Sequence, residues 1–307
     1  MGTSKPPLPA NGVYAALATP RRPDSTAPDT AALLDYLDAI VHAGIHGVVL
    51  LGATGEFAHF EIDERMRLLA FAVRRSRVPV LANASHSTLA GAVALARHAV
   101  QSGAAGVLLV PPYFDRYTEA QIAQFYKEFL GRLDGEIPVY IYNLPFFTNR
   151  ISPALAENLL ASGAFAGIKD SSGEWEMFEA LNVLRRKREF KLLIGSESLY
   201  LRARLAGADG IVSGVAAALP ELVVAIDSAI STSDLARAQQ LDSRLQEFVT
   251  WLPKFPTAIG IKQAAVVRGW THHHFAVPLD AETMRLLAEF RAWLRDWIPM
   301  VLRESQI

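Results

Sequence analysis

A single lysine closes a short apolar run in the middle of the chain. Residues 165–168 read Phe-Ala-Gly-Ile, which is typical of a parallel strand covered on both faces, and Lys169 follows directly. At the end of such a strand a side chain can point into a pocket, where loss of water favours the neutral amine over the ammonium ion. A neutral amine can attack a ketone and form a Schiff base. The alternative is a surface lysine in a salt bridge with Asp170.

Polar residues also follow two other apolar runs. Residues 52–56 read Gly-Ala-Thr-Gly-Glu, and their backbone N–H groups and the Thr54 hydroxyl could hold a carboxylate at the start of the next helix. The alternative is a simple turn in which Glu56 caps that helix and complements its dipole. Tyr142 ends the other run and could transfer a proton or hydrogen-bond an oxyanion. A core tyrosine with a satisfied hydroxyl is the alternative there.

A third polar cluster, formed by Gly195, Ser196 and Glu197, follows the apolar run at residues 191–194. Its hydroxyl and carboxylate suit the hydroxyl groups of a substrate, whereas a helix N-cap is the alternative. One lysine, one tyrosine, one anion-binding loop and a hydroxyl-rich loop together indicate carbonyl chemistry on a small keto acid.

The residues that position these groups form short β-rich runs that alternate with helical patterns. Apolar residues recur at helical spacing over residues 30–43, for example, and Gly44 stands where that helix should end. Most of the runs are apolar throughout, as in parallel strands, and no Gly-x-Gly-x-x-Gly follows the first one. The eight runs are residues 13–18, 47–51, 78–82, 106–110, 139–142, 166–168, 191–194 and 210–212.

Eight strand–helix units predict an α/β fold, a closed (β/α)8 TIM barrel, and not an open doubly wound sheet. We expect a flexible N-terminal tail over residues 1–11, the barrel over residues 12–219, and a C-terminal helical extension over residues 220–307. The carboxyl ends of the strands meet at one face of such a barrel. The polar clusters described above would therefore lie together.

The composition excludes several classes of protein. The chain has 307 residues, of which 51% are hydrophobic, a formal net charge of −1 and no cysteine. This charge creates no field that attracts nucleic acid or an anionic membrane, and without cysteine there are no disulfides or thiol nucleophiles. No apolar run reaches the roughly 18–20 residues of a membrane span. The adjacent histidines 272–274 cannot all face one ion from regular structure, so we expect a solvated loop and no metal site.

Several segments together resemble the dihydrodipicolinate synthase / N-acetylneuraminate lyase superfamily. Gly-Ala-Thr-Gly-Glu at 52–56, Tyr-Asn-Leu-Pro at 142–145 and Gly-Ile-Lys-Asp at 167–170 follow the order of the family, as do residues 16–20 and 208–213. The resemblance extends from about residue 12 to residue 300. It implies a (β/α)8 enzyme, a class I lyase or a related enzyme, that binds pyruvate or another 2-keto acid as a Schiff base.

The resemblance also implies roles for individual residues. Lys169 matches the lysine that forms the Schiff base, and Tyr142 matches the tyrosine that moves protons at the Schiff base and the substrate oxygen. Thr54, with the backbone of its loop, matches the site that holds the keto-acid carboxylate. Gly195 and Val212 match positions that line the pocket near the imine. No metal or organic cofactor is implied, because the iminium itself accepts the electrons.

Three positions differ from the synthase pattern. Ala53, a further residue of the expected substrate site, stands where synthases carry a second hydroxyl that relays protons to the tyrosine. A second tyrosine of that relay, which a neighbouring subunit supplies, would align with Phe114, or with Tyr113 after a shift of one residue. Phe147 stands where synthases carry an arginine for the carboxylate of the aldehyde partner. A phenyl ring cannot replace a guanidinium in binding a carboxylate.

We therefore expect a lyase or aldolase that cleaves or forms a C–C bond between pyruvate and an aldehyde. Ser196 and Glu197 could bind a polyol, which favours a 2-keto-3-deoxy sugar acid or a similar 2-keto acid, and the apolar wall at Phe147 would also accept a hydrophobic aldehyde. The alternatives are a 4-hydroxy-tetrahydrodipicolinate synthase, a 2-keto-3-deoxy sugar-acid dehydratase and a non-catalytic keto-acid-binding protein.

The expected partners are small molecules, namely a keto acid such as pyruvate together with an aldehyde or sugar acid. Neither nucleic acid nor a membrane is expected as a partner. The resemblance implies a homo-oligomer, a tetramer or a dimer, and we expect a cytoplasmic protein.

Overall fold

The computed structural model describes residues 11–23, 25–134 and 136–306. Residues 1–10, which make up nearly all of the expected N-terminal tail, lie outside the described residues. None of the helices in the described part of the chain is long and apolar enough to cross a membrane.

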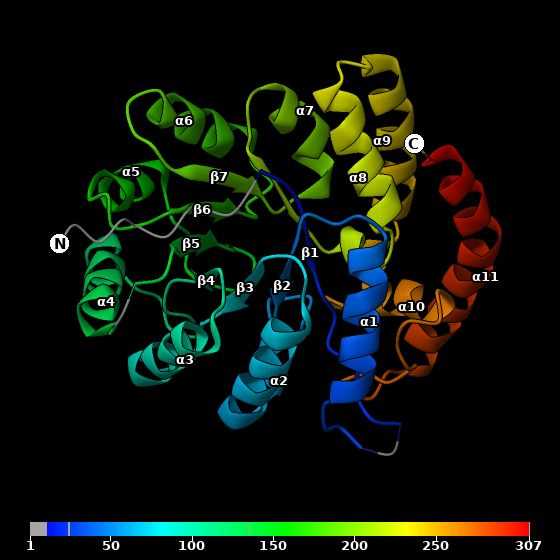
Figure 1. Ribbon diagram of the computed structural model, residues 1–307, viewed down its shortest axis with the longest axis horizontal. Coiled ribbons are helices and arrows are strands. Elements are labelled where there is room, and N and C mark those ends of the chain that lie inside the picture. Colours follow the sequence, from blue (N-terminus) through cyan, green and yellow to red (C-terminus); the bar gives the residue numbers. More distant parts are fainter. Residues whose placement is uncertain (1–10, 24, 135, 307) are drawn as a thin grey trace.

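Eight parallel strands form a closed barrel in chain order, and β8 pairs with β1 to close it (Figure 1). The predicted (β/α)8 fold is thereby confirmed. The strands are short and buried, as their uniformly apolar sequences predict. Their bounds are β1 Gly12–Ala16, β2 Gly47–Leu50, β3 Val80–Asn83, β4 Gly106–Leu109, β5 Val139–Asn143, β6 Gly167–Asp170, β7 Lys191–Ile194 and β8 Gly210–Ser213.

A helix follows each strand, and together these helices surround the barrel (Figure 1). Side-chain caps fix several of their starts: Asp29, Thr88 and Ser152 each accept a hydrogen bond from a backbone N–H group in the first turn. The bounds are α1 Thr30–His42, α2 Ile62–Arg75, α3 Leu89–Ser102, α4 Glu119–Arg132, α5 Pro153–Ala161, α6 Trp175–Arg185, α7 Tyr200–Leu205 and α8 Pro220–Ser231.

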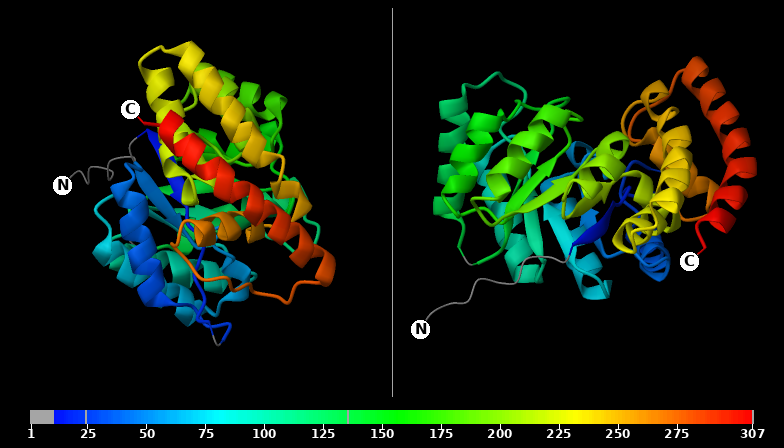
Figure 2. Two further views of the ribbon diagram at one scale, coloured as in Figure 1. Left: turned by 90° about the vertical axis from the view of Figure 1, so that its right-hand side faces the viewer. Right: turned by 90° about the horizontal axis from the view of Figure 1, so that it is seen from above.

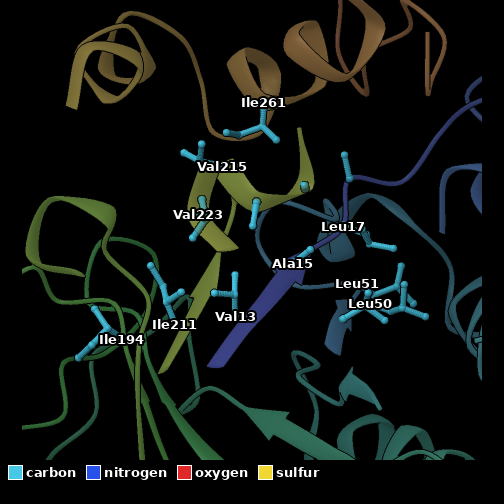
Figure 3. Close-up of a cluster of buried hydrophobic side chains, with 14 of the residues drawn as sticks. Val13, Ala15, Leu17, Leu50, Leu51, Ile194, Ile211, Val215, Val223 and Ile261 are labelled. Carbon is cyan, nitrogen blue, oxygen red and sulfur yellow. The ribbon is translucent and has the colours of Figure 1, made fainter. Parts of the chain in front are cut away.

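The hydrophobic core has two layers because side chains alternate between the two faces of each strand. Val13 and Ala15 of β1 face the surrounding helices and belong to the larger, outer layer. Tyr14 and Ala16 face the barrel interior, where they pack with residues such as Tyr142. Figure 3 shows part of the outer layer around β1 and β8. The interior layer closes the lower part of the barrel, so any site must lie above it, at the strand ends.

Three further helices form the C-terminal extension: α9 Leu235–Val249, α10 Ile259–Val267 and α11 Ala281–Glu304. They lie beside α8 at one side of the barrel (Figure 2). Aromatic side chains join α9 to α11, and Phe248 of α9, for example, packs against Phe290 of α11 with the ring centres 5.7 Å apart. α8 packs on both β1 and α9. The expected division between residues 219 and 220 therefore stays a prediction.

Helix α10 connects the extension with the carboxyl ends of the strands. It packs on the short 3-10 helix η3 (Val215–Ala217), which follows β8. Figure 3 shows Ile261 of α10 next to Val215 of η3. The C-terminal extension consequently forms part of the face at which the polar clusters lie.

Candidate active site

Lys169 and Tyr142 lie side by side at the carboxyl ends of β6 and β5. They occupy the same register position of the two paired strands. The Lys169 Nζ lies 3.9 Å from the centre of the Tyr142 ring, and the two residues are only 4% and 2% exposed. The burial of Lys169 removes the surface-lysine alternative, and the Asp170 carboxylate accepts hydrogen bonds from Asn143 and Ser172 instead. The arrangement places an amine and a phenol hydroxyl together above the interior core.

Asp170 points to the other side of β6 and locks the ends of two strands together. Its carboxylate accepts hydrogen bonds from Asn143 Nδ2 at 2.7 Å and from Ser172 Oγ at 2.8 Å. Asn143 Oδ1 in turn accepts the backbone N–H of Ile151 at 3.1 Å. Burial raises the pKa of Asp170 although these hydrogen bonds oppose the shift. The network therefore fixes the ends of β5 and β6, the strands that carry Tyr142 and Lys169.

The loop of residues 52–56 is folded tightly against its neighbours. Thr19 Oγ1 donates a hydrogen bond of 2.8 Å to the carbonyl of Gly55. A Cβ atom at Gly55 would lie 2.8 Å from the Leu51 Cα, so only glycine fits there. A Cβ atom at Gly214, after β8, would lie 3.2 Å from Thr54 Oγ1. The Thr54 hydroxyl is thus directed toward the β8 end of the barrel.

The Glu56 side chain caps no helix, so the capping alternative is wrong. Helix α2 is capped by Glu61 in a capping box, whereas Glu56 precedes the short 3-10 helix η1 (Phe57–His59) with a left-handed backbone, φ 55°, and no side-chain cap hydrogen bond. Its carboxylate binds Lys262 of α10, with Nζ and Oε2 2.6 Å apart, and lies 3.7 Å from Arg21 Nε. Burial lowers the pKa of Lys262, and the nearby Glu56 opposes that shift. The sequence gives no signal for this cluster, because Lys262 lies 206 residues after Glu56.

The polar cluster after β7 contacts both Lys169 and the loop after β8. A Cβ atom at Gly195 would lie 1.9 Å from Ser171 Oγ and 3.1 Å from Lys169 Cε, so this glycine leaves the space that both side chains occupy. Glu197 Oε1 accepts hydrogen bonds from Ser213 Oγ at 2.7 Å and from the Val215 N–H at 3.1 Å. The Ser196 hydroxyl is paired with that of Ser198 at 2.9 Å. One oxygen of Glu197 therefore already joins the loops after β7 and β8 by hydrogen bonds.

The other expected site residues lie at the top of the barrel interior or on its rim. Val212 is 1% exposed and belongs to the interior cluster together with Tyr142. Ala53 packs against the same cluster. Phe147 lies on the rim, where it is 49% exposed and meets Phe146 edge-on with ring centres 4.8 Å apart.

A cavity of about 320 Å³ opens at this rim. Ala53, Leu144 and Phe147 line it from the barrel, and residues 256, 257, 259 and 275–277 line it from the extension. No sequence pattern predicted that the extension would contribute to this cavity. The complete lining is Ala53, Glu56, Phe57, Ala58, His59, Tyr113, Leu144, Phe147, Thr148, Pro256, Thr257, Ile259, Phe275, Ala276 and Val277.

Tyr113 and Phe114 have different surroundings. Tyr113 lines the cavity and packs edge-on against Phe57, with the ring centres 6.1 Å apart. Burial raises the pKa of its phenol. Phe114 is 98% exposed and has a left-handed backbone with φ 83°. Within one chain, Tyr113 is therefore the aromatic residue of this pair that faces the site.

The histidines at 272–274 include two with separate neighbours. His272 Nε2 lies 3.6 Å from Asp29 Oδ2, and His273 packs edge-on against Phe275. The part of the chain that the structure describes holds no group of three or more histidine or acidic side chains placed to bind a metal ion.

Comparison with known proteins adds independent evidence. The model of the Dihydrodipicolinate synthetase family matches residues 9–295. The chain is 30% identical to a 4-hydroxy-tetrahydrodipicolinate synthase of Methanococcoides burtonii over 281 residues, which cover 90% of this chain and 96% of the relative.

Two solved structures are similar over nearly the whole chain. YagE of E. coli K12, a prophage protein of the dihydrodipicolinic acid synthase family determined in complex with pyruvate, has a TM-score of 0.85 at 25% identity. The alignment covers 94% of this chain and 98% of YagE. KD(P)GA from T. tenax has a TM-score of 0.82 at 25% identity, with 93% and 99% covered.

Proposed function

The chain belongs to the dihydrodipicolinate synthetase family, and we propose from this premise that it is a pyruvate-dependent class I lyase or aldolase whose Schiff base forms on Lys169. The observation that carries the proposal is the contact between the Lys169 Nζ and the Tyr142 ring, 3.9 Å apart and buried at the ends of two paired strands. A relative in complex with pyruvate supports the keto-acid substrate.

The chemistry follows from the two side chains. The neutral amine of Lys169 attacks the C2 carbonyl of the 2-keto acid, and water leaves as the iminium forms. When the C3–C4 bond breaks, its electron pair moves toward the iminium and gives an enamine, while the C4 hydroxyl loses its proton and becomes an aldehyde. Tyr142 accepts that proton or returns it in the reverse direction, which is worth about 10²–10⁴-fold in rate.

The substrate carboxylate is assigned to the loop of residues 52–56. The Thr54 hydroxyl and the backbone N–H groups of this loop provide donors without a formal charge. The loop is held in place by the hydrogen bond from Thr19 and by the ion pair between Glu56 and Lys262. Gly195 leaves space for the lysine side chain, and Val212 closes the pocket from below.

The substrate expected from the sequence is a 2-keto-3-deoxy sugar acid or a similar 2-keto acid. The similarity to KD(P)GA supports an aldolase of this kind. A 4-hydroxy-tetrahydrodipicolinate synthase is the second candidate, because a relative with that activity is 30% identical over almost its whole length. The residues at Ala53 and Phe147 depart from the synthase pattern, and for this reason the lyase remains the leading proposal. We further propose a homo-oligomer, a tetramer or a dimer, in the cytoplasm.

Incubation with pyruvate and borohydride tests the proposal. Reduction of an imine should produce a stable covalent adduct of one pyruvate per chain, visible by mass spectrometry of the intact protein. Tyr142→Phe should keep the adduct but lose turnover by about 10²–10⁴-fold, because the ring remains and the proton carrier is gone. A folded wild-type protein without any adduct would overturn the proposal.

A further inference from the structure

The 320 Å³ cavity adjoins the place at which the Schiff base would form. Ala53 and Tyr113, which line the cavity, also pack against the interior cluster that contains Tyr142. Leu144 belongs both to the lining and to that cluster. A 2-keto acid bound to Lys169 with its carboxylate at Thr54 would therefore extend its far end into this cavity.

The cavity offers little to a charged or polyhydroxylated tail. Its lining contains no lysine or arginine to pair with a carboxylate. Besides Glu56 and Thr148, its polar side chains are His59, Tyr113 and Thr257. Oε2 of Glu56 is held by Lys262. The Thr148 hydroxyl lies 3.0 Å and 3.2 Å from the carbonyl oxygens of Leu144 and Asn149 and shares its one proton between them. A polar tail would lose its water without regaining all of its hydrogen bonds.

The remaining surface is apolar and largely aromatic. Phe57, Tyr113, Phe147 and Phe275 contribute rings from four separate segments, and small or branched side chains such as Val277 fill the space between them. Aromatic rings prefer edge-to-face or offset contact with another ring. The cavity volume falls at the lower end of the roughly 300–1,000 Å³ typical of small-molecule sites.

We propose, on the basis of the proposed function, that this cavity binds the aldehyde half of the substrate and that its tail is an aromatic or comparable apolar group. Of the two tails that the sequence leaves open, a polyol or an apolar chain, the cavity selects the apolar one, so on this point the proposal replaces the sugar acid named above. The substrate of the cleavage direction is then a 4-aryl-4-hydroxy-2-keto acid. Its C3–C4 bond breaks, the C4 hydroxyl proton leaves, and an aromatic aldehyde and the enamine of pyruvate are formed. Protonation at C3 and addition of water release pyruvate and regenerate Lys169.

Three substrates that differ only in the tail test this proposal with the full-length protein. They carry a phenyl, a polyol or a carboxylate group at C4 of a 4-hydroxy-2-keto acid, and pyruvate release is followed. We expect kcat/KM to be highest for the phenyl substrate by about tenfold or more. A polyol or carboxylate substrate that is used as well as or better than the phenyl substrate would overturn the proposal.

Val277→Asp and Val183→Asp are matched variants for the same test. Both valines are surface residues, 48% and 52% exposed, but only Val277 lines the cavity. A carboxylate at position 277 should lower kcat/KM for the phenyl substrate about tenfold, and the same change at position 183 should leave it unaltered. Equal effects of the two substitutions would contradict the assignment.

The pyruvate adduct separates this proposal from the function on which it rests. Both variants should form the borohydride adduct with pyruvate as the wild type does, because pyruvate alone does not reach the cavity. If the adduct forms but the phenyl substrate is not preferred, the proposal of an apolar tail is refuted, whereas the proposed Schiff-base function is retained. Absence of the adduct in the wild type overturns the proposed function itself.

Discussion

Replacement of Lys262 by methionine tests the buried ion pair that anchors the expected carboxylate-binding loop. Its Nζ lies 2.6 Å from Glu56 Oε2, and the two side chains are 0% and 7% exposed. Methionine keeps the apolar stem but removes the charge, so that Glu56 retains only Arg21, whose Nε is 3.7 Å away. Removal of one partner of a buried pair costs about 3–5 kcal/mol. We expect a loss near 3 kcal/mol in the free energy of unfolding, since Arg21 still offsets part of the charge.

The expected loss translates into a change of melting temperature. An unfolding entropy of about 2.1 cal/mol/K per residue amounts to roughly 0.6 kcal/mol/K for the 307 residues. Lys262→Met should therefore lower Tm by about 5 °C in differential scanning calorimetry. The exposed pair of Arg285 and Glu289, 61% and 51% exposed, is the control. Arg285→Met should cost only about 0.3–0.5 kcal/mol, or less than about 1 °C.

A second substitution tests whether Arg21 also depends on the Glu56 carboxylate. The variant that combines Lys262→Met with Glu56→Gln removes both charges of the pair but leaves the buried guanidinium of Arg21, whose Nε lies 3.7 Å from that carboxylate, without its partner, so Tm should stay at or below that of Lys262→Met. The same anchoring predicts a higher KM for pyruvate in Lys262→Met, because the loop that holds the carboxylate is released. A Tm within 1 °C of the wild type for Lys262→Met, or a double variant as stable as the wild type, would refute the reasoning.

Three other predictions concern the surroundings of the expected active site. Gly195→Ala places a Cβ atom 1.9 Å from Ser171 Oγ and 3.1 Å from Lys169 Cε, so both side chains must shift and formation of the pyruvate adduct should slow, whereas Gly131→Ala, with no atom within 4 Å of its Cβ, should leave it unchanged. Phe147→Arg should lower KM for aldehyde partners that carry a carboxylate by about tenfold, as initial rates would report, and unchanged kinetics would contradict the assignment of that loop. Burial raises the pKa of Asp170 above its ordinary 3.8, so the folded state binds this proton more tightly than the unfolded chain. Its contribution to stability is therefore largest below pH 3.8 and declines as pH rises through the raised pKa. The difference in unfolding free energy between the wild type and Asp170→Asn, measured in urea at several pH values, should decline over this interval, and a difference that grows would contradict the sign.

The barrel and its reactive pair could be predicted because both depend on local patterns. Apolar runs with flanking helices identify the strands, and closure of the barrel brings their carboxyl ends to one face. Once β5 and β6 are neighbours, Tyr142 and Lys169 at their ends must meet, and the structure places them in register. Prediction of this pair required only the order of the strands and not the details of packing.

Features that join distant segments could not be predicted in this way. Glu56 has the sequence context of a helix cap, but its true partners are Arg21 and Lys262, which come from other parts of the chain. Glu197 appeared available for substrate hydroxyls, yet one of its oxygens accepts hydrogen bonds from the loop after β8. The outer wall of the cavity comes from loops of the extension, whose position depends on how α10 packs.

The location of the pyruvate adduct tests the central claim most directly. The wild type, Lys169→Arg and Lys127→Arg are each incubated with pyruvate and borohydride, digested, and analysed by mass spectrometry of the peptides. Lys127 is an exposed lysine of α4 and serves as the control. We expect the adduct on Lys169 in the wild type and in Lys127→Arg, and no adduct in Lys169→Arg. An adduct on another lysine, or an adduct that persists in Lys169→Arg, would contradict the account.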